Sequence, residues 1–325
     1  MKSVKVKAHS NIALIKYWGK KDEELFLPYN SSLSMTLDAF YTITNVEKID
    51  SDKDIFYLDG KLQNENETAK ISKFVERFRK LSGKNFRVKV DSTNYFPTAA
   101  GLASSASGFA ALAGALNEIY ETSLDKKGLS IMARKGSGSA TRSIFGGFVE
   151  WKKGHDDESS YAEKFDDGSW DIGMIIVILN DKKKKVLSRA GMKRTVETCP
   201  FYPAWVEEAK SDLEDIKDAI KGQDLNRVGD IAEYSAMKMH ATMMATRPSI
   251  IYMQPKTLEV IELVKSLREQ GMSCYVTMDA GPNVKIVTSS KYKDEIFERL
   301  KDIVDDNKII YSKIGSDLEV LERVI

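Results

Sequence analysis

The sequence contains very little cysteine and histidine, which excludes two kinds of site. Its 325 residues include two cysteines, Cys199 and Cys274, and three histidines, His9, His155 and His240. Two cysteines cannot form a disulfide framework or a cysteine-rich zinc site. The histidines lie far apart and form no HExxH pair, so we expect no structural or catalytic zinc.

Long apolar runs and an excess of one charge are also absent. The longest apolar run, residues 174–179, is much shorter than the roughly 20 residues of a membrane-spanning helix. The first ten residues lack the apolar core of a signal peptide, so we expect a cytoplasmic protein without a membrane partner. The 49 Lys and Arg residues balance 48 Asp and Glu residues, which argues against nucleic-acid binding through bulk charge.

The remaining composition is that of an ordinary globular protein, and its length suggests about two domains. Short apolar or alternating runs predict strands at 12–18, 41–46, 54–58, 86–90, 174–179, 274–278, 284–287 and 308–313. Helical spacing predicts helices at 65–80, 109–120, 204–221, 227–240, 257–270 and 293–304. The sum is an α+β protein in which helices cover antiparallel sheet. We place the domain boundary at the charged run 181–185, to within about a dozen residues, although a solvated loop is the favoured interpretation of the run itself.

A segment of small residues precedes one predicted helix. Nine of the twelve residues in PTAAGLASSASG, 97–108, are Gly, Ala or Ser. Small side chains let a phosphate approach the backbone, and unpaired N–H groups at a helix start attract anions. Ser104, Ser105 and Ser107 would add hydroxyls there. The segment lacks the G-K-[ST] of a Walker A motif, and a packing seam beside a helix cap is an equally good interpretation.

Three further segments carry charged residues among small ones. NIALIKYWGK, 11–20, contains Lys16 and Lys20, which could hold an anionic substrate or protect an edge strand. GSGSATRSIFGG, 136–147, contains Arg142, which suits bidentate capture of a carboxylate or phosphate but could also be a surface arginine. DAGPN, 279–283, opens with Asp279, which taken alone is a turn-capping residue.

Taken together and in order, these segments resemble the GHMP small-molecule kinase superfamily and, within it, the diphosphomevalonate decarboxylases. The resemblance also includes SRAGMKRTVET, 188–198, and MHATMMATRPSIIYM, 239–253, and it extends from about residue 8 to about residue 290. The KYWGK and DAGPN segments point to the decarboxylase branch, because a general kinase of the superfamily would share only the small-residue loop and the architecture.

The resemblance implies a GHMP-kinase-like fold of two domains. Residues 1–185 would form a ribosomal-S5-like α/β domain that binds nucleotide, and residues 186–325 a ferredoxin-like α+β domain, with the active site between them. It also implies a reaction that uses ATP and Mg²⁺. The tertiary hydroxyl of mevalonate diphosphate is phosphorylated, and phosphate and CO₂ then leave to give isopentenyl diphosphate. Homodimers are usual in such a family.

The resemblance assigns roles to substrate-binding residues. Asp279 would be the catalytic acid/base and Arg142 the clamp on the substrate carboxylate. Ser188, Lys16 and Asn11 would complete the catalytic set. The implied substrate-binding residues are Tyr17, Lys20, Ser137, Ser139, Arg142 and Arg189, with Arg189 on the diphosphate.

The same resemblance assigns the ATP phosphates to the small-residue loop. The implied residues are Ala103, Ser104, Ser105, Ala106, Ser107 and Gly108. Ser105 and Ser107 are the candidates for contact with phosphate or Mg²⁺.

Three alternatives remain open at this point. The chain could be a decarboxylase of the monophosphate, a kinase that does not decarboxylate, or a non-catalytic sensor of a nucleotide or metabolite. The presence of both Asp279 and Arg142 argues against the kinase and the sensor.

Overall fold

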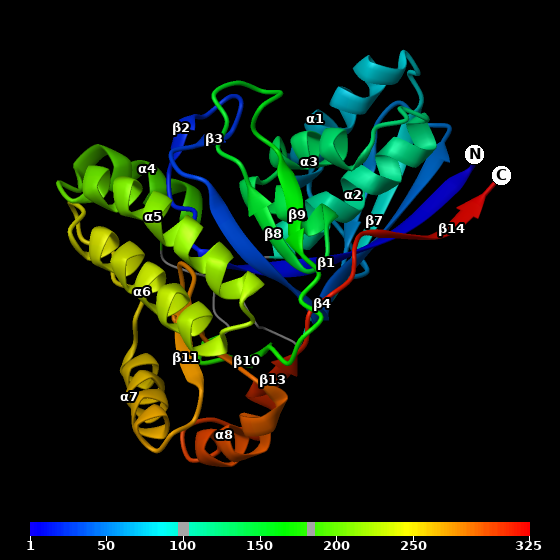
Figure 1. Ribbon diagram of the computed structural model, residues 1–325. Coiled ribbons are helices and arrows are strands. Elements are labelled where there is room, and N and C mark those ends of the chain that lie inside the picture. The colour runs from blue at the N-terminus through cyan, green and yellow to red at the C-terminus, as the bar shows by residue number, and fades with distance from the viewer. Residues whose placement is uncertain (97–103, 181–185) are drawn as a thin grey trace.

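The computed structural model describes residues 1–96, 104–180 and 186–325, whose strands form two main sheets (Figure 1). The first is eight-stranded, and its main path runs β14-β1-β4-β7-β5-β6, with β8 and β9 added beside β4. Its strands are β1 (Ser3–Ile15), β4 (Ser32–Ile49), β5 (Ile55–Leu58), β6 (Lys61–Leu62), β7 (Arg87–Tyr95), β8 (Phe148–Trp151), β9 (Ala162–Asp166) and β14 (Glu319–Val324). A short hairpin of β2 (Lys20–Asp22) and β3 (Leu27–Pro28) extends from the end of β1.

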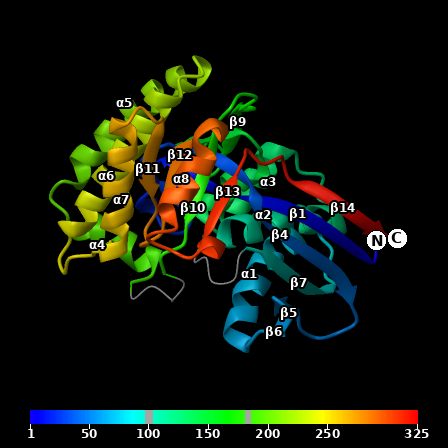
Figure 2. The ribbon, with the colours of Figure 1, turned by 90° about the horizontal axis from the view of Figure 1, so that it is seen from below.

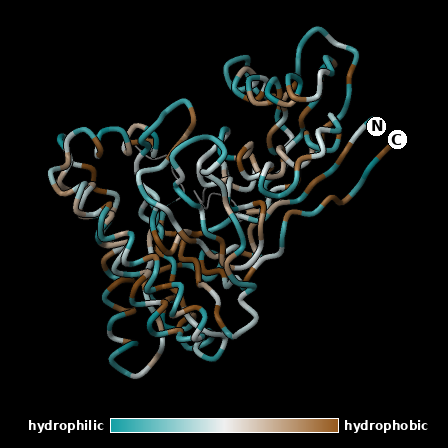
Figure 3. The backbone as a smooth tube through the Cα atoms, turned by 45° about the horizontal axis from the view of Figure 1, so that its top comes forward, coloured by the Kyte–Doolittle hydropathy of each residue, from teal (hydrophilic) through white to brown (hydrophobic). Residues whose placement is uncertain are grey.

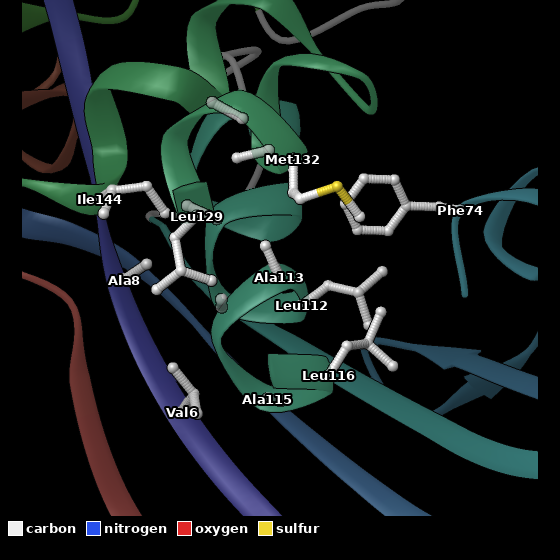
Figure 4. Close-up of a cluster of buried hydrophobic side chains, with 14 of the residues drawn as sticks. Val6, Ala8, Phe74, Leu112, Ala113, Ala115, Leu116, Leu129, Met132 and Ile144 are labelled. Carbon is white, nitrogen blue, oxygen red and sulfur yellow. The ribbon is translucent and has the colours of Figure 1, made fainter. Parts of the chain in front are cut away.

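Three helices and one 3₁₀ helix pack against this first sheet. They are α1 (Glu65–Ser82), α2 (Ser104–Tyr120), α3 (Lys126–Arg134) and η1 (Gly138–Ile144). Helix α2 lies at the centre, and its buried alanines allow it to approach β1 closely (Figure 4). Val6 and Ala8 of β1 lie in the same core as Leu112 and Leu116 of α2.

The second sheet is four-stranded and antiparallel, in the order β11-β12-β10-β13. Along the chain, β10 (Gly173–Val177) is followed by helices, then β11 (Cys274–Met278), β12 (Val284–Thr288), α8 (Lys293–Leu300) and β13 (Ile309–Ser312). This βαββαβ arrangement is that of a ferredoxin-like domain, as expected. Two 3₁₀ turns, η2 (Ser290–Tyr292) and η3 (Asp306–Lys308), flank α8.

Four helices lie between β10 and β11, and hydrophobic and hydrophilic residues alternate along the last three of them (Figure 3). They are α4 (Ser188–Thr198), α5 (Tyr202–Lys221), α6 (Leu225–Met244) and α7 (Pro255–Glu269). Among the described residues, no helix is long and apolar enough to cross a membrane.

Strand β10 is buried on both faces and joins the two parts of the molecule. Ile175 and Val177 belong to the core formed with α7 and α8. Met174 and Ile176 belong to a second core, which includes residues of β1, β4, α5 and α6. Because side chains alternate along a strand, one strand supplies both cores and fixes the two sheets against each other.

Sheet membership does not follow a cut at residue 185. β10 precedes that position but pairs with β12 and β13, whereas β14 returns to pair with β1 near the other terminus (Figures 1 and 2). The division into residues 1–185 and 186–325 therefore stays a prediction, and the run at 181–185 lies outside the described residues.

Most predicted elements are confirmed, with shifted ends. The first strand begins at Ser3 rather than at residue 12, α2 begins at Ser104 rather than 109, and α8 ends at Leu300 rather than 304. The sequence analysis missed the helices α3 and α4 and the strands β2, β3, β6, β8, β9 and β14. Only Gly191 and Thr195 of α4 are buried, so that helix has no apolar stripe to reveal it.

A buried ion pair fastens α1 to the first sheet, and we expect its disruption to destabilise the protein. Arg79 and Asp54 are paired with side chains only 3% and 2% exposed, and Arg79 Nε also donates to the Phe86 carbonyl at 3.0 Å. Asp54→Ala would leave the buried guanidinium with only the half-exposed carboxylate of Glu76, at 3.3 Å, and cost about 3 kcal/mol of unfolding free energy in urea titrations. The exposed Lys70–Glu67 pair is the control, because Glu67→Ala should cost at most about 0.5 kcal/mol. A loss below about 1 kcal/mol for Asp54→Ala would contradict this account.

Candidate active site

A cavity of about 320 Å³ lies where the two parts of the molecule meet. The end of β1, the first turns of α2 and α4, the 3₁₀ helix η1, helix α6 and the turn after β11 surround it. The predicted site residues that border it are Asn11, Lys16, Tyr17, Lys20, Ser105, Ser137, Ser139, Arg142, Ser188, Arg189 and Asp279. Ser104, Ala106, Ser107 and Gly108 do not border it, and Ala103 lies outside the described residues.

Two lysines hold Asp279 at the inner end of the cavity. Lys16 Nζ donates to Oδ1 at 3.0 Å, and Lys285 Nζ lies 3.1 Å from Oδ2. Lys16 follows β1, Lys285 belongs to β12, and Asp279 begins the turn between β11 and β12. We call Lys16, Asp279 and Lys285 the lysine clamp. It joins three segments that belong to both sheets.

The lysine clamp shifts the ionisation of its members. Burial opposes ionisation of Asp279, but the charges of Lys16 and Lys285 outweigh it and hold the pKa of this carboxyl well below its usual range. Burial lowers the pKa of Lys16 to about 8, although Asp279 attracts its proton. The Asp279 side chain is 34% exposed, while that of Lys16 is 1% exposed. The Asp279 carboxylate is therefore accessible from the cavity, whereas the ammonium group of Lys16 is buried and pairs with it.

Arg142 presents a buried guanidinium to the same cavity. It is 2% exposed, and burial lowers its pKa to about 10. Its Nε donates to Asn11 Oδ1 at 3.2 Å and its Nη1 to Ser32 Oγ at 2.5 Å. No carboxylate of the described residues forms a salt bridge with it, so neutral groups hold it in place. A fixed and desolvated guanidinium of this kind is suited to an anionic ligand.

Two more cations lie at the rim of the cavity, beside the same aromatic ring. Lys20 Nζ lies 4.1 Å and the Arg189 guanidinium carbon 5.6 Å from the centre of the Phe26 ring. Lys20 also pairs with Glu23 at 2.8 Å. The hairpin of β2 and β3 carries Lys20 and Phe26, whereas Arg189 comes from the first turn of α4. Two different elements therefore each bring a cation to the rim, and one of these cations, Lys20, is already paired with Glu23.

The small residues of GSGSATRSIFGG have a packing reason. A Cβ atom on Gly138 would lie 3.1 Å from the Tyr17 hydroxyl and 3.0 Å from the Trp151 ring. That Tyr17 hydroxyl is buried and has no hydrogen-bond partner among the described residues. Ser137 Oγ lies 3.4 Å from Ser105 Oγ and 3.3 Å from Ser139 Oγ, which connects η1 to the start of α2.

The turn that carries KYWGK requires glycine at residue 19. Gly19 has φ +115°, and a Cβ atom there would lie 2.0 Å from the Tyr202 hydroxyl. Tyr202 uses that hydroxyl to donate to the Trp18 carbonyl at 2.7 Å. Helix α5 thus fixes the direction in which the chain leaves β1 between Lys16 and Lys20.

The geometry does not support a ligand contact at Ser107. Its hydroxyl is fully buried, 2.7 Å from Thr42 Oγ1, and it also donates to the Ser104 carbonyl at 3.4 Å. This serine fixes α2 to β4, because its hydroxyl points into the protein. Ser104 and Ser105, by contrast, are exposed.

The sequence analysis missed several residues of the site. Lys285 is one, although it follows Asp279 across the predicted strand–turn–strand and lies opposite Thr277. His240 is another: it is 2% exposed, and its Nε2 donates to the Asp279 carbonyl at 3.2 Å. Burial and repulsion from Lys16 lower the His240 pKa to about 4, so this ring is neutral at physiological pH. The missed residues that border the cavity are Ala13, Trp18, Phe26, Phe109, Gly136, Gly138, Met192, Met239 and Ala280.

Comparison with known proteins places the whole chain in one family. Residues 8–162 match the family model for the diphosphomevalonate decarboxylase-like N-terminal domain, and residues 174–321 match that for the mevalonate 5-diphosphate decarboxylase C-terminal domain. The Candida albicans diphosphomevalonate decarboxylase is 35% identical over 92% of this chain and 88% of its own length. The human enzyme is 36% identical over 86% of this chain and 74% of its own length.

Solved structures agree with these sequence matches. A structure of MDDEF in complex with MVAPP, AMPPCP and magnesium has a TM-score of 0.95 and 46% identity, and covers 99% of both chains. Mevalonate diphosphate decarboxylase from Staphylococcus aureus also has a TM-score of 0.95 and 46% identity, covering 99% of this chain and 98% of that one. The predicted α+β, GHMP-kinase-like two-part fold is confirmed. These matches extend over both parts of the molecule, and the chain belongs to the diphosphomevalonate decarboxylase family.

Proposed function

We propose that this chain converts mevalonate 5-diphosphate and ATP to isopentenyl diphosphate, CO₂, ADP and phosphate. The relatives named above are diphosphomevalonate decarboxylases, and a structure 46% identical to this chain is a complex with MVAPP, AMPPCP and magnesium. The observation that carries the proposal is Asp279, the one carboxylate that borders the cavity among the described residues, held between lysines beside the buried guanidinium of Arg142.

The reaction needs two events, one at a tertiary hydroxyl and one at the bond between the carboxylate and the neighbouring carbon. Phosphoryl transfer from ATP first converts the hydroxyl into a good leaving group. The C–O bond then breaks with its electron pair on the phosphate, and the C–C bond to the carboxylate supplies the pair that forms the new double bond as CO₂ departs. No organic electron sink is required, so the protein's task is to hold charges in place.

Asp279 would act on the substrate hydroxyl. The lysine clamp keeps its carboxylate ionised, so it can accept a hydrogen bond from the hydroxyl and orient the oxygen. A carboxylate with a depressed pKa is a weak base in the free protein. It would therefore take the proton late, once the oxygen is bonded to phosphorus and the proton has become acidic. His240 supports it through the backbone only.

The cations divide the substrate's negative charges between them. Arg142 would bind the carboxylate, and Asn11 positions Arg142 by accepting its Nε–H. Lys20 and Arg189 would bind the diphosphate at the rim, together with the unpartnered hydroxyl of Tyr17. The hydroxyls of Ser137, Ser139 and Ser188 border the same cavity and are proposed as further donors.

The start of α2 fits the phosphates of ATP. Ser104 and Ser105 are exposed there, and Ser105 borders the cavity. The first N–H groups of a helix attract anions. No group of three or more His, Cys, Asp or Glu residues that could hold a metal occurs in the described parts of the chain. Mg²⁺ would then be held largely by the nucleotide phosphates, with Ser105 as the proposed protein ligand, and would neutralise charge during transfer.

Some expectations are carried forward as parts of this proposal. They are a cytoplasmic location, a homodimer, a division of the chain at residue 185, and phosphate contacts by Ala103, Ala106 and Gly108. Ser107 is left out, because its hydroxyl is buried against Thr42.

The proposed function is tested by measuring two products together. Purified protein receives ATP, Mg²⁺ and mevalonate diphosphate, and ADP and CO₂ are followed in one reaction. We expect equal amounts of both. ADP without CO₂ would identify a kinase that does not decarboxylate. Turnover only on the monophosphate would identify the alternative decarboxylase, and no turnover on either substrate would favour a sensor.

Replacing the clamped carboxylate should abolish turnover without unfolding the protein, although stability should fall because two buried lysines lose their counter-charge. Asp279→Asn keeps the size of the side chain but removes its charge, so we expect kcat to fall at least about 10³-fold. Asp215→Asn is the matched control, because Asp215 is about half exposed on α5 and lies outside the cavity lining. Circular dichroism should be unchanged for both variants. Near-normal CO₂ release by Asp279→Asn would refute the role of Asp279.

The rim cations should set the preference for a diphosphate. Lys20→Met removes one contact to the terminal phosphate, so kcat/KM should fall about 10- to 100-fold on mevalonate diphosphate and much less on the monophosphate. Lys21→Met, a change at the neighbouring exposed lysine, is the control. An equal loss on both substrates would show that Lys20 does not contact the terminal phosphate.

A further inference from the structure

Lys285 is a buried cation for which the reaction so far has no use. It lies in β12, is 4% exposed, and does not border the cavity. Its Nζ lies 3.1 Å from Asp279 Oδ2 and 3.4 Å from the Asn283 carbonyl oxygen. Burying an ammonium group is costly unless it is paired, and Asp279 is the only carboxylate within salt-bridge distance of this one among the described residues.

The charged groups around Asp279 come from four elements or their ends. Lys16 follows β1, Arg142 lies in η1, Lys285 lies in β12, and His240 lies in α6. His240 is neutral at physiological pH, so one carboxylate faces three buried cations. Each oxygen of Asp279 has its own lysine, which prevents the carboxylate from rotating about its last bond.

We propose that Lys285 is a positioning residue for the reaction, which fixes the plane of the Asp279 carboxylate and repels the proton on Lys16. This inference rests on the proposed function of the cavity. With Oδ2 held by Lys285, Asp279 presents a single orientation to the substrate hydroxyl. With Lys285 charged, Lys16 keeps its proton less firmly than it would beside Asp279 alone.

A merely structural role for Lys285 makes a different prediction. A buried ion pair that only fastens the β11–β12 turn would lower activity at every pH to the same degree when it is removed. The proposed role changes the titration of Lys16 as well. The pH profile of kcat/KM distinguishes the two, because it reports the ionisation of groups in the free enzyme.

The direction in which the pH profile of kcat/KM should shift follows from the charges around Lys16. In the unaltered protein kcat/KM should fall on the alkaline side with an apparent pKa near 8, as Lys16 loses its proton. Lys285→Met removes a like charge, so the pKa of Lys16 rises and the alkaline limb moves up by about one pH unit. Because the carboxylate loses its fixed orientation, kcat should fall about tenfold, with a smaller change in KM.

The experiment compares Lys285→Met with two variants. Lys285→Arg retains the charge and should leave the alkaline limb near its original position. Lys217→Met is the matched control, because Lys217 is also largely buried and pairs with Glu150 at 2.9 Å away from the cavity lining. In Lys217→Met the alkaline limb of the kcat/KM profile should stay at its original pH. If Lys285→Met does not fold, Lys285→Gln carries the same expectation. An alkaline limb that stays in place without the lysine overturns the proposal.

A second measurement separates this proposal from the proposed function. Lysine labelled with ¹³C at Cε is titrated by NMR in the ligand-free protein, and the Lys16 resonance is identified by its loss in Lys16→Met. Its midpoint should rise in Lys285→Met and stay in place in Lys217→Met. If the unaltered protein releases no CO₂, the proposed function fails, yet this midpoint still decides whether Lys285 controls Lys16. An unchanged midpoint overturns the proposal even if turnover is robust.

Discussion

The contact between Asp279 and two buried lysines is the interaction on which the site depends. Loss of water ordinarily raises the pKa of a carboxyl group in a cavity. For Asp279, the charges of Lys16 and Lys285 outweigh this effect and lower the pKa. The lysines in turn are stable in the interior because Asp279 is there. The charges of Asp279 and of the two lysines therefore stabilise one another. Lys16 follows β1, whereas Asp279 and Lys285 belong to the turn after β11 and to β12. The site can form only when the two sheets are already in register.

That register is imposed by apolar packing. β1 alternates between buried and half-buried positions in its first half and is wholly buried in its second, where it runs between the two parts of the molecule. β10 places its side chains in two cores at once. Lys16 and Asp279 therefore meet at the end of β1, a strand whose position is fixed by hydrophobic burial. The free energy of apolar packing elsewhere in the protein offsets the cost of placing three cations beside one carboxylate.

The sequence predicts most of the elements and many of the residues that border the cavity, because both have local signals. Helical and alternating periodicity located most of the helices and strands, and the order of small-residue and charged segments located eleven of the residues that border the cavity. It failed where the signal is not local. The sequence does not distinguish Lys285 from the other lysines. Its place beside Asp279 depends on the strand register, which sets it opposite Thr277. Ser107 has the composition of a phosphate ligand, but its position on α2 turns its hydroxyl towards Thr42. β14 is identified only by its pairing with β1.

The net charge of the whole chain gives no sign of an anionic ligand, because the positive charge is concentrated around the cavity. The whole chain carries a formal charge of +1, yet the cavity is bordered by Lys16, Lys20, Arg142 and Arg189 against Asp279 alone. Neutral groups hold Arg142, whereas Lys20 and Arg189 lie beside the Phe26 ring. A ligand that contacts Arg142 as well as Lys20 and Arg189 would carry more than one anionic group. A carboxylate at one end and a diphosphate at the other meet that requirement, and a ligand charged at only one end leaves part of the cavity unpaired.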